Sequence, residues 1–222
     1  MKTPKLIVID VDGTLVDSVP DLAFCVDAMM RHMGLPERGE LAVRQWVGNG
    51  VERLVQRALM NQLEGQVDAA AFAQAMPIFM ALYADNTSQR STLYPGVSTG
   101  LAYLASRGFL LGCVTNKAEQ FTLPILQDLG IRDYFKIVVS GDSLDKKKPD
   151  PMPLLHIANA LSTAPEACLM IGDSVSDVKA ARAAQFDIIC MSYGYNHGVD
   201  IRLSEPDLVI DSFDAFRDIF PA

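Results

Sequence analysis

The chain has 222 residues, half of them hydrophobic, which is enough for one large domain or for a domain with a modest insertion. Acidic residues outnumber basic ones by 27 to 19, and the net charge of -8 argues against a protein that binds nucleic acid through a broadly positive surface. The sequence shows neither a membrane-spanning run nor a secretion signal, so we expect a cytoplasmic protein without a membrane partner.

Short apolar runs predict the strands of a parallel sheet. The first run, from Leu6 to Ile9, is uninterrupted, which is typical of a strand buried on both faces. Helical patterns separate the later runs, and two of the helices are expected to stop at Gly108 and Gly130. This alternation predicts a doubly wound α/β domain. The predicted strands are residues 6–9, 109–114, 137–139, 168–171, 188–191 and 208–210.

Residues 18–88 interrupt the alternation. A helix that Ser18 is expected to cap is followed by helical patterns at 41–47, 51–63 and 69–84, with no strand pattern among them. An all-helical block between the first strand and the rest of a sheet predicts an inserted cap. We therefore expect a core formed by residues 1–17 and 89–222, and a helical cap formed by residues 18–88.

Polar residues follow four of the predicted strands. In open α/β sheets ligands bind outside the carboxyl ends of the strands, so these side chains are expected to share one pocket. They are Asp10 and Asp12 after the first strand, Thr115 and Asn116 after the second, Lys148 after the third, and Asp173 and Asp177 after the fourth.

The charges of this set indicate phosphoryl transfer. Two like charges about 4 Å apart repel by on the order of 4 kcal/mol at an effective dielectric constant of about 20, so converging carboxylates require protonation or a bound cation. Oxygen ligands without thiolate or imidazole favour Mg²⁺ over Zn²⁺. Thr115, Asn116 and Lys148 would supply hydrogen-bond donors and charge to the oxygens of the transferred group.

The order of these residues resembles that of the haloacid dehalogenase (HAD) superfamily of phosphohydrolases. The matching motifs are DVDGTL from Asp10, TNK from Thr115, the Lys148-Pro149 step, and GDSVSD ending at Asp177. The resemblance extends over essentially the whole chain and implies a Rossmann-like core with an inserted helical cap. Within the superfamily the chain is most similar to the bacterial phosphoglycolate phosphatases, on residues 46–50, 93–96, 148–151 and 193–196.

The resemblance implies a covalent mechanism. Asp10 would be the nucleophile that forms an aspartyl-phosphate. Asp12 would act as general acid toward the leaving oxygen and then as general base toward water. The phosphate would be bound by Thr115, Asn116 and Lys148.

The resemblance also implies a metal site for Mg²⁺. Its protein ligands would be the carboxylates of Asp10 and Asp173 and the backbone carbonyl of Asp12. Asp177 would support these ligands without binding the ion itself.

For the substrate, the resemblance implies a small phosphorylated metabolite, with 2-phosphoglycolate hydrolysed to glycolate and phosphate. Amides of Gly48, Asn49 and Gly50 in the cap could contact its carboxylate. Two positions depart from the family pattern, because Ser176 replaces a common asparagine and Gln185 a common glycine. If the backbone at Gln185 is left-handed, this residue is expected to cost roughly 1 kcal/mol relative to glycine.

Particular residues argue for or against other functions of the same fold. Asp12 argues against a dehalogenase, and the lack of lysine in residues 18–88 argues against a phosphonatase, which needs a cap lysine. A sugar-phosphate phosphatase or phosphomutase shares the core residues and stays open. A non-catalytic metabolite-binding or signalling protein is the alternative from another class, but retention of both Asp10 and Asp12 argues against it.

Overall fold

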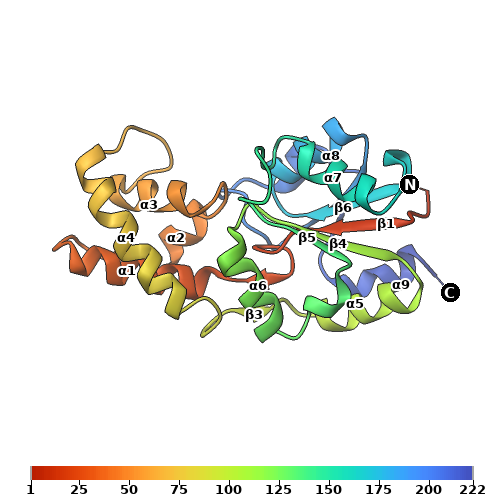
Figure 1. Cartoon of the computed structure of the whole chain (residues 1–222), viewed down its shortest axis with the longest axis horizontal. Helices are drawn as coiled ribbons and strands as arrows, with labels where there is room; N and C mark the ends of the chain where they lie inside the picture. The colour runs from red at the N-terminus through yellow and green to blue at the C-terminus, as the bar shows by residue number, and fades with distance from the viewer. Residues whose placement is uncertain (1, 222) are drawn as a thin grey trace.

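Within residues 2–221, which the computed structural model describes, one parallel sheet of six strands runs through the core (Figure 1). The strand order is β5-β4-β1-β6-β7-β8, so the chain starts in the middle of the sheet and winds outward in both directions. This confirms the predicted doubly wound α/β fold. The strands are β1 (Leu6–Ile9), β4 (Leu110–Val114), β5 (Ile137–Val139), β6 (Cys168–Gly172), β7 (Asp187–Met191) and β8 (Leu208–Ile210).

Helices cover both faces of the sheet, which explains why its strands are apolar throughout. Ile7 and Ile9 of β1 pack against one group of helices, whereas Leu6 and Val8 pack against the other, and all four side chains are fully buried. Figure 1 shows the two groups on opposite sides of the sheet. One group is α5 (Val97–Ser106), α6 (Glu119–Asp128) and α9 (Phe216–Ile219), and the other is α7 (Met152–Ala160) and α8 (Val175–Ala184).

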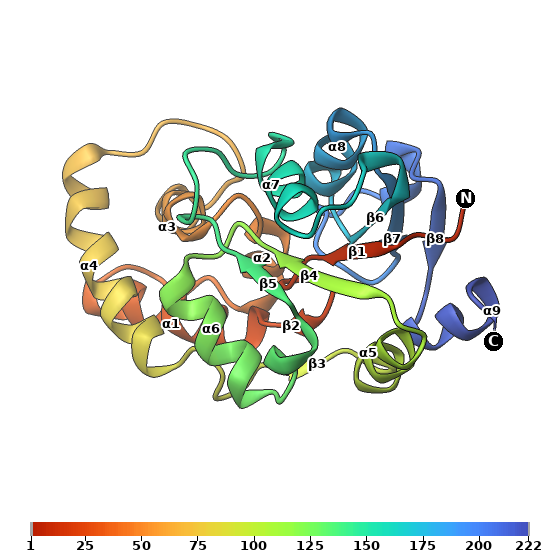
Figure 2. The same ribbon diagram turned by 45° about the vertical axis from the view of Figure 1, so that its right-hand side comes forward.

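A separate layer of helices lies beyond one edge of the core (Figures 1 and 2). It has its own apolar cluster, in which Met29, Phe79 and Tyr83 are fully buried. None of the helices in residues 2–221 is both long and apolar enough to cross a membrane. The layer consists of α1 (Val19–His32), α2 (Glu40–Trp46), α3 (Val51–Met60) and α4 (Ala69–Asp85).

The two crossings between the sheet and the helical layer are tied together. Strands β2 (Val16–Asp17) and β3 (Thr92–Leu93) pair antiparallel where the chain leaves and returns. The buried carboxylate of Asp21 in α1 accepts the backbone N–H groups of Arg90 and Ser91 and the Ser91 hydroxyl, at 2.7–3.0 Å. These short strands were not predicted, because two residues are too few for a periodic pattern.

Two local expectations were met only in part. Ser18 stands at the start of α1, but its side chain does not cap the helix; instead its Oγ donates to Oδ1 of Asp12 at 2.6 Å. The third helix of the layer ends at Met60, before the predicted end at residue 63. Asn61 takes the left-handed conformation there (φ 54°), which terminates the helix.

Gln185 adopts the left-handed conformation considered from the sequence, with φ 63° directly after α8. We predict that Gln185→Gly stabilises the protein by about 1 kcal/mol, because glycine has no Cβ to crowd the carbonyl at positive φ. The matched control is Ala183→Gly, at an exposed position within the same helix, which should destabilise by about 1 kcal/mol. Denaturant unfolding of the wild type and of both variants measures these changes in the free energy of unfolding. Equal effects at the two positions would show that backbone strain at Gln185 is negligible.

Candidate functional site

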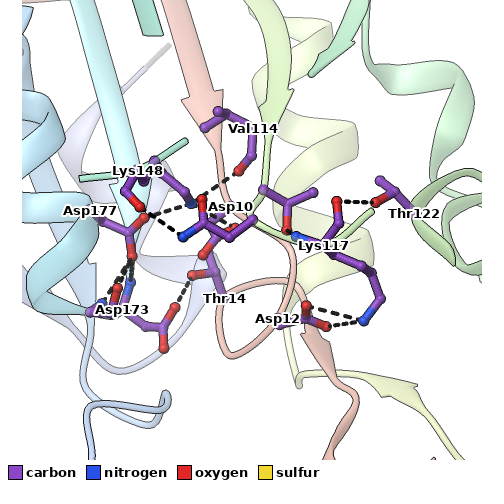
Figure 3. A network of polar contacts seen from close by, with 12 residues as sticks. Asp10, Asp12, Thr14, Val114, Lys117, Thr122, Lys148, Asp173 and Asp177 are labelled. Carbon is purple, nitrogen blue, oxygen red and sulfur yellow. Dashed lines mark hydrogen bonds and ion pairs between the residues drawn. The ribbon is translucent and has the colours of Figure 1, made fainter. Parts of the chain in front are cut away.

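The residues predicted to act together surround one cavity of about 400 Å³ at the carboxyl ends of the central strands. Figure 3 shows how the charged residues among them meet. Asp177 is the exception, because it lies behind the cavity wall at the start of α8 and does not line the cavity. Those that line it are Asp10, Asp12, Gly48, Asn49, Gly50, Thr115, Asn116, Lys148 and Asp173.

Lys148 connects two of the carboxylates. Its Nζ lies 2.8 Å from Oδ1 of Asp10 and 2.7 Å from Oδ1 of Asp177, and it donates to the carbonyl of Val114 at 3.2 Å (Figure 3). Burial alone would lower the pKa of Lys148, but Asp10 and Asp177 raise it above its ordinary value, so the ammonium stays charged. The side chain therefore places a fixed positive charge beside Asp10.

The acidic cluster still carries more negative charge than Lys148 can offset. Carboxylate oxygens of Asp10, Asp173 and Asp177 lie within 4.8 Å of one another. Burial raises the pKa of Asp10 to about 7, although Lys148 opposes the shift. Burial, together with the charges of Asp177 and Asp10, raises the pKa of Asp173 well above its ordinary value. A metal ion would remove this repulsion, and a purely oxygen donor set is suited to a hard cation.

The hydrogen bonds divide the cluster into two kinds of carboxylate. Asp177 has both oxygens engaged, one by Lys148 and the other by Ser174 and the backbone N–H of Asp173. Asp173 accepts one hydrogen bond on each oxygen, from the Thr14 hydroxyl at 2.8 Å and from the Tyr195 backbone N–H at 2.5 Å. Asp10 and Asp173 face the cavity and could hold a metal ion, whereas Asp177 positions its neighbours.

Asp12 lies on the other side of Asp10 and has a lysine of its own. Nζ of Lys117 is 3.0 and 3.1 Å from the two oxygens of Asp12, and the lysine side chain is almost completely buried (Figure 3). Burial alone would lower the pKa of Lys117, but Asp12 and Tyr83 raise it above its ordinary value. Lys117 belongs to the TNK motif, from which no role for it was predicted. Its position directly after Thr115 and Asn116 was the available signal.

Thr115 and Asn116 place hydrogen-bond donors opposite the carboxylates. Oγ1 of Thr115 accepts the backbone N–H of Lys117 at 3.2 Å, which leaves its hydroxyl proton free to donate. The side-chain amide of Asn116 donates to the Lys148 carbonyl at 2.9 Å. Among the hydrogen bonds of residues 2–221, none uses the Asn116 backbone N–H as donor. The backbone N–H of Asn116 is therefore a free donor in the cavity wall, whereas its side-chain amide already donates within the protein.

The helical layer closes the cavity with a turn between α2 and α3. Gly48, Asn49 and Gly50 all have positive φ angles, of 118°, 69° and 93°. A Cβ on Gly50 would lie 3.4 Å from Nζ of Lys147 and 3.6 Å from the Asn116 carbonyl oxygen, so the turn packs directly on the loops of the sheet. These three residues thus face the same space as the acidic cluster.

Two residues outside the helical layer, neither predicted to be functional, contact the turn or the helix before it. Lys147 donates from Nζ to the Asn49 carbonyl at 3.3 Å. His197 lies with Nδ1 2.8 Å from the Gln45 carbonyl, so this nitrogen must carry the donated proton. In sequence, Lys147 was part of a run of lysines typical of a solvated surface, and His197 was isolated. Their contacts depend on segments far apart in the chain.

Comparisons with known proteins agree with this geometry. The family model for haloacid dehalogenase-like hydrolases matches residues 7–191. The phosphoglycolate phosphatase of Nitrosococcus oceani is 66% identical over 212 residues, covering 96% of this chain and 94% of the relative. That of Nitrosospira multiformis is 45% identical, with 94% and 92% coverage.

A solved structure shows the same architecture over nearly the whole chain. The crystal structure of a Haemophilus somnus protein, described as a predicted phosphoglycolate phosphatase, superposes with a TM-score of 0.92 at 36% identity, and the match covers 99% of each chain. Motifs, fold and relatives agree, and the chain belongs to the haloacid dehalogenase-like hydrolases.

Proposed function

We propose that this chain is a Mg²⁺-dependent phosphomonoesterase that hydrolyses 2-phosphoglycolate through an aspartyl-phosphate on Asp10. The observation that carries the proposal is the pair of acids after β1, Asp10 and Asp12, each beside its own buried lysine in one cavity. Such a pair suits a nucleophile and an acid–base group that act in turn. The choice of substrate is supported by relatives named phosphoglycolate phosphatase at 66% and 45% identity.

In the first half-reaction a carboxylate oxygen of Asp10 forms a bond to phosphorus and the bond to the leaving oxygen breaks. Asp12 donates its proton to that oxygen, so glycolate leaves as an alcohol. Thr115, Lys148 and the Asn116 backbone N–H donate to the phosphoryl oxygens. Mg²⁺ beside Asp10 and Asp173 would supply positive charge that reduces repulsion between the carboxylate and the phosphate.

In the second half-reaction water replaces Asp10 on phosphorus. Asp12, now ionised, takes a proton from the water as its oxygen bonds to phosphorus, and the bond between phosphorus and Asp10 breaks. Lys117 holds the carboxylate of Asp12 in place through both steps. Inorganic phosphate leaves and both aspartates return to their starting states.

Residues 18–88 would act as a cap over this chemistry, with the remaining residues as the core. Helices α1–α4 lie together and place the turn of Gly48, Asn49 and Gly50 over the acidic cluster. The backbone amides of this turn are proposed to bind the substrate carboxylate, because among residues 2–221 none of the three donates a hydrogen bond to a protein acceptor. Closure of the cap would exclude bulk water from the phosphoryl group.

The substrate assignment is tested by phosphate release from a panel of phosphate esters in the presence of Mg²⁺. The panel contains 2-phosphoglycolate, 2-hydroxyethyl phosphate (its analogue without the carboxylate), glycerol phosphate, and glucose 1- and 6-phosphates. We expect kcat/KM for 2-phosphoglycolate to exceed the other values by at least about tenfold, because the cavity offers contacts for a second anionic group. A clear preference for a sugar phosphate, or its isomerisation without phosphate release, would contradict the proposal.

A further inference from the structure

A buried arginine supports the turn that closes the cavity. Arg57 of α3 is only 3% exposed, yet it lies in the cavity wall behind Gly48 and Asn49. Its Nη1 donates to the carbonyls of Trp46 and Gly48 at 2.7 and 3.3 Å, and its Nη2 donates to Oδ1 of Asn49 at 3.2 Å. Nε donates to the Leu63 carbonyl at 3.2 Å. One guanidinium thus connects the residues at the start of the turn with Leu63, in the loop that follows α3.

These contacts occupy the guanidinium almost completely. Arginine has five N–H groups, and four of them are used within the helical layer. The remaining edge of Nη2 lies 3.8 Å from the exposed carboxylate of Glu64. Arg57 therefore keeps at most one N–H group for a substrate, on the edge of Nη2 that faces Glu64, and most of its effect on substrate would be transmitted through the turn.

The turn needs such support because its backbone is unusual. Three successive residues at positive φ include Asn49, whose side chain would otherwise favour negative φ. The hydrogen bonds of Arg57 fix the carbonyls of Trp46 and Gly48, and among residues 2–221 the three N–H groups of the turn donate to no protein acceptor. Without the guanidinium, the carbonyls would need other donors and the turn could rotate its amides away from the cavity.

We infer that Arg57 is a positioning residue that sets selectivity for an anionic leaving group, by holding the turn of Gly48, Asn49 and Gly50 in its cavity-facing conformation. This inference rests on the proposed phosphatase function. Under this inference, two parts of the cavity have different tasks. The sheet loops bind the phosphoryl group independently of Arg57, whereas recognition of the carboxylate depends on it.

The test compares two substrates of nearly equal size, 2-phosphoglycolate and 2-hydroxyethyl phosphate, in which an uncharged hydroxymethyl group replaces the carboxylate. In Arg57→Gln, kcat/KM for 2-phosphoglycolate should fall about 100-fold, mainly through KM, and that for 2-hydroxyethyl phosphate less than about fivefold. Arg57→Lys should recover about a tenth of the wild-type value, because it keeps the charge and up to three donors. The inhibition constant of inorganic phosphate should not change in either variant.

The matched control is Arg53→Gln. Arg53 lies one turn earlier in the same helix and contacts Gln56, Leu63 and Glu64, but it makes no hydrogen bond to the turn. This variant should retain the substrate preference of the wild type. If Arg57→Gln does not fold, Asn49→Gly removes one partner of the guanidinium at a backbone that glycine tolerates, and it should lower only the 2-phosphoglycolate value.

The outcomes separate this inference from the proposed function. A wild-type enzyme that hydrolyses both substrates equally would refute the proposed substrate class. A wild-type preference that survives in Arg57→Gln, or an equal loss with both substrates in the folded variant, would refute the role of Arg57 while leaving the phosphatase function intact.

Discussion

Asp10→Asn is expected to lower phosphate release by roughly four orders of magnitude or more while leaving the protein folded. The amide has the same shape as the carboxylate but is a far weaker nucleophile. Lys148 keeps its contacts with Asp177 and the Val114 carbonyl, so no buried cation is left unpaired. Loss of one charge from the acidic cluster should, if anything, stabilise the metal-free fold.

Initial rates and a thermal melt of the same sample measure both parts of this expectation. The control is Asp218→Asn, the same chemical change at an exposed position of α9, which should retain full activity. Acid quenching of the wild type during turnover should trap phosphate on the peptide that contains Asp10, and no such adduct should form in the variant. Near-normal turnover in Asp10→Asn would exclude it as the nucleophile.

Removal of divalent ions is expected to stop turnover, and Mg²⁺ should restore it. Oxygens of Asp10 and Asp173 lie within 4.8 Å of each other, and among residues 2–221 Lys148 is the one basic side chain that forms an ion pair with either carboxylate. Phosphate release measured in EDTA, and again after addition of excess Mg²⁺, checks this expectation. Asp173→Asn should raise the Mg²⁺ concentration that gives half-maximal activity by at least about tenfold, because it removes one of the proposed ligands. Full activity in EDTA would contradict a metal requirement.

The same charges predict how stability depends on pH. Burial raises the pKa of Asp10 to about 7, and burial with its acidic neighbours raises that of Asp173, so the folded metal-free protein binds protons more tightly than the unfolded chain. Between about pH 4 and pH 7, the stability of the metal-free protein should therefore be greatest at the lower end and should fall as the pH rises. Mg²⁺ should raise the melting temperature more at pH 8 than at pH 5.5, where protons compete for the carboxylates. An equal increase at both pH values would contradict this linkage.

Much of the core could be predicted because its signals are local. Each apolar run is long enough to specify a strand, and the polar residue that follows it marks the carboxyl end. Parallel strands place these ends at one edge, so Asp10, Thr115 and Asp173 converge whatever the details of packing. The left-handed backbone at Gln185 was raised only as a condition, from the glycine common in the family, and the structure shows that the condition holds.

Contacts between distant segments could not be predicted in this way. The Ser18 hydroxyl was expected to cap its own helix, but packing of the crossing brings it to Asp12. Lys147 stands in a run of three lysines, a pattern typical of a solvated surface, yet it reaches the Asn49 carbonyl. Arg57 has the sequence pattern of an ordinary helix-surface residue, although it is almost completely buried.

The sequence by itself determined the family of the chain, the strand ends that carry its polar residues, and the types of group available for phosphoryl transfer. Only the tertiary structure decided which lysine pairs with which aspartate, which contacts Asp177 makes with its neighbours, and how the helical layer meets the sheet. The physical reason is the distance along the chain over which each interaction acts. Backbone periodicity depends on neighbouring residues, whereas a buried ion pair or a closing turn depends on which distant surfaces pack together and exclude water.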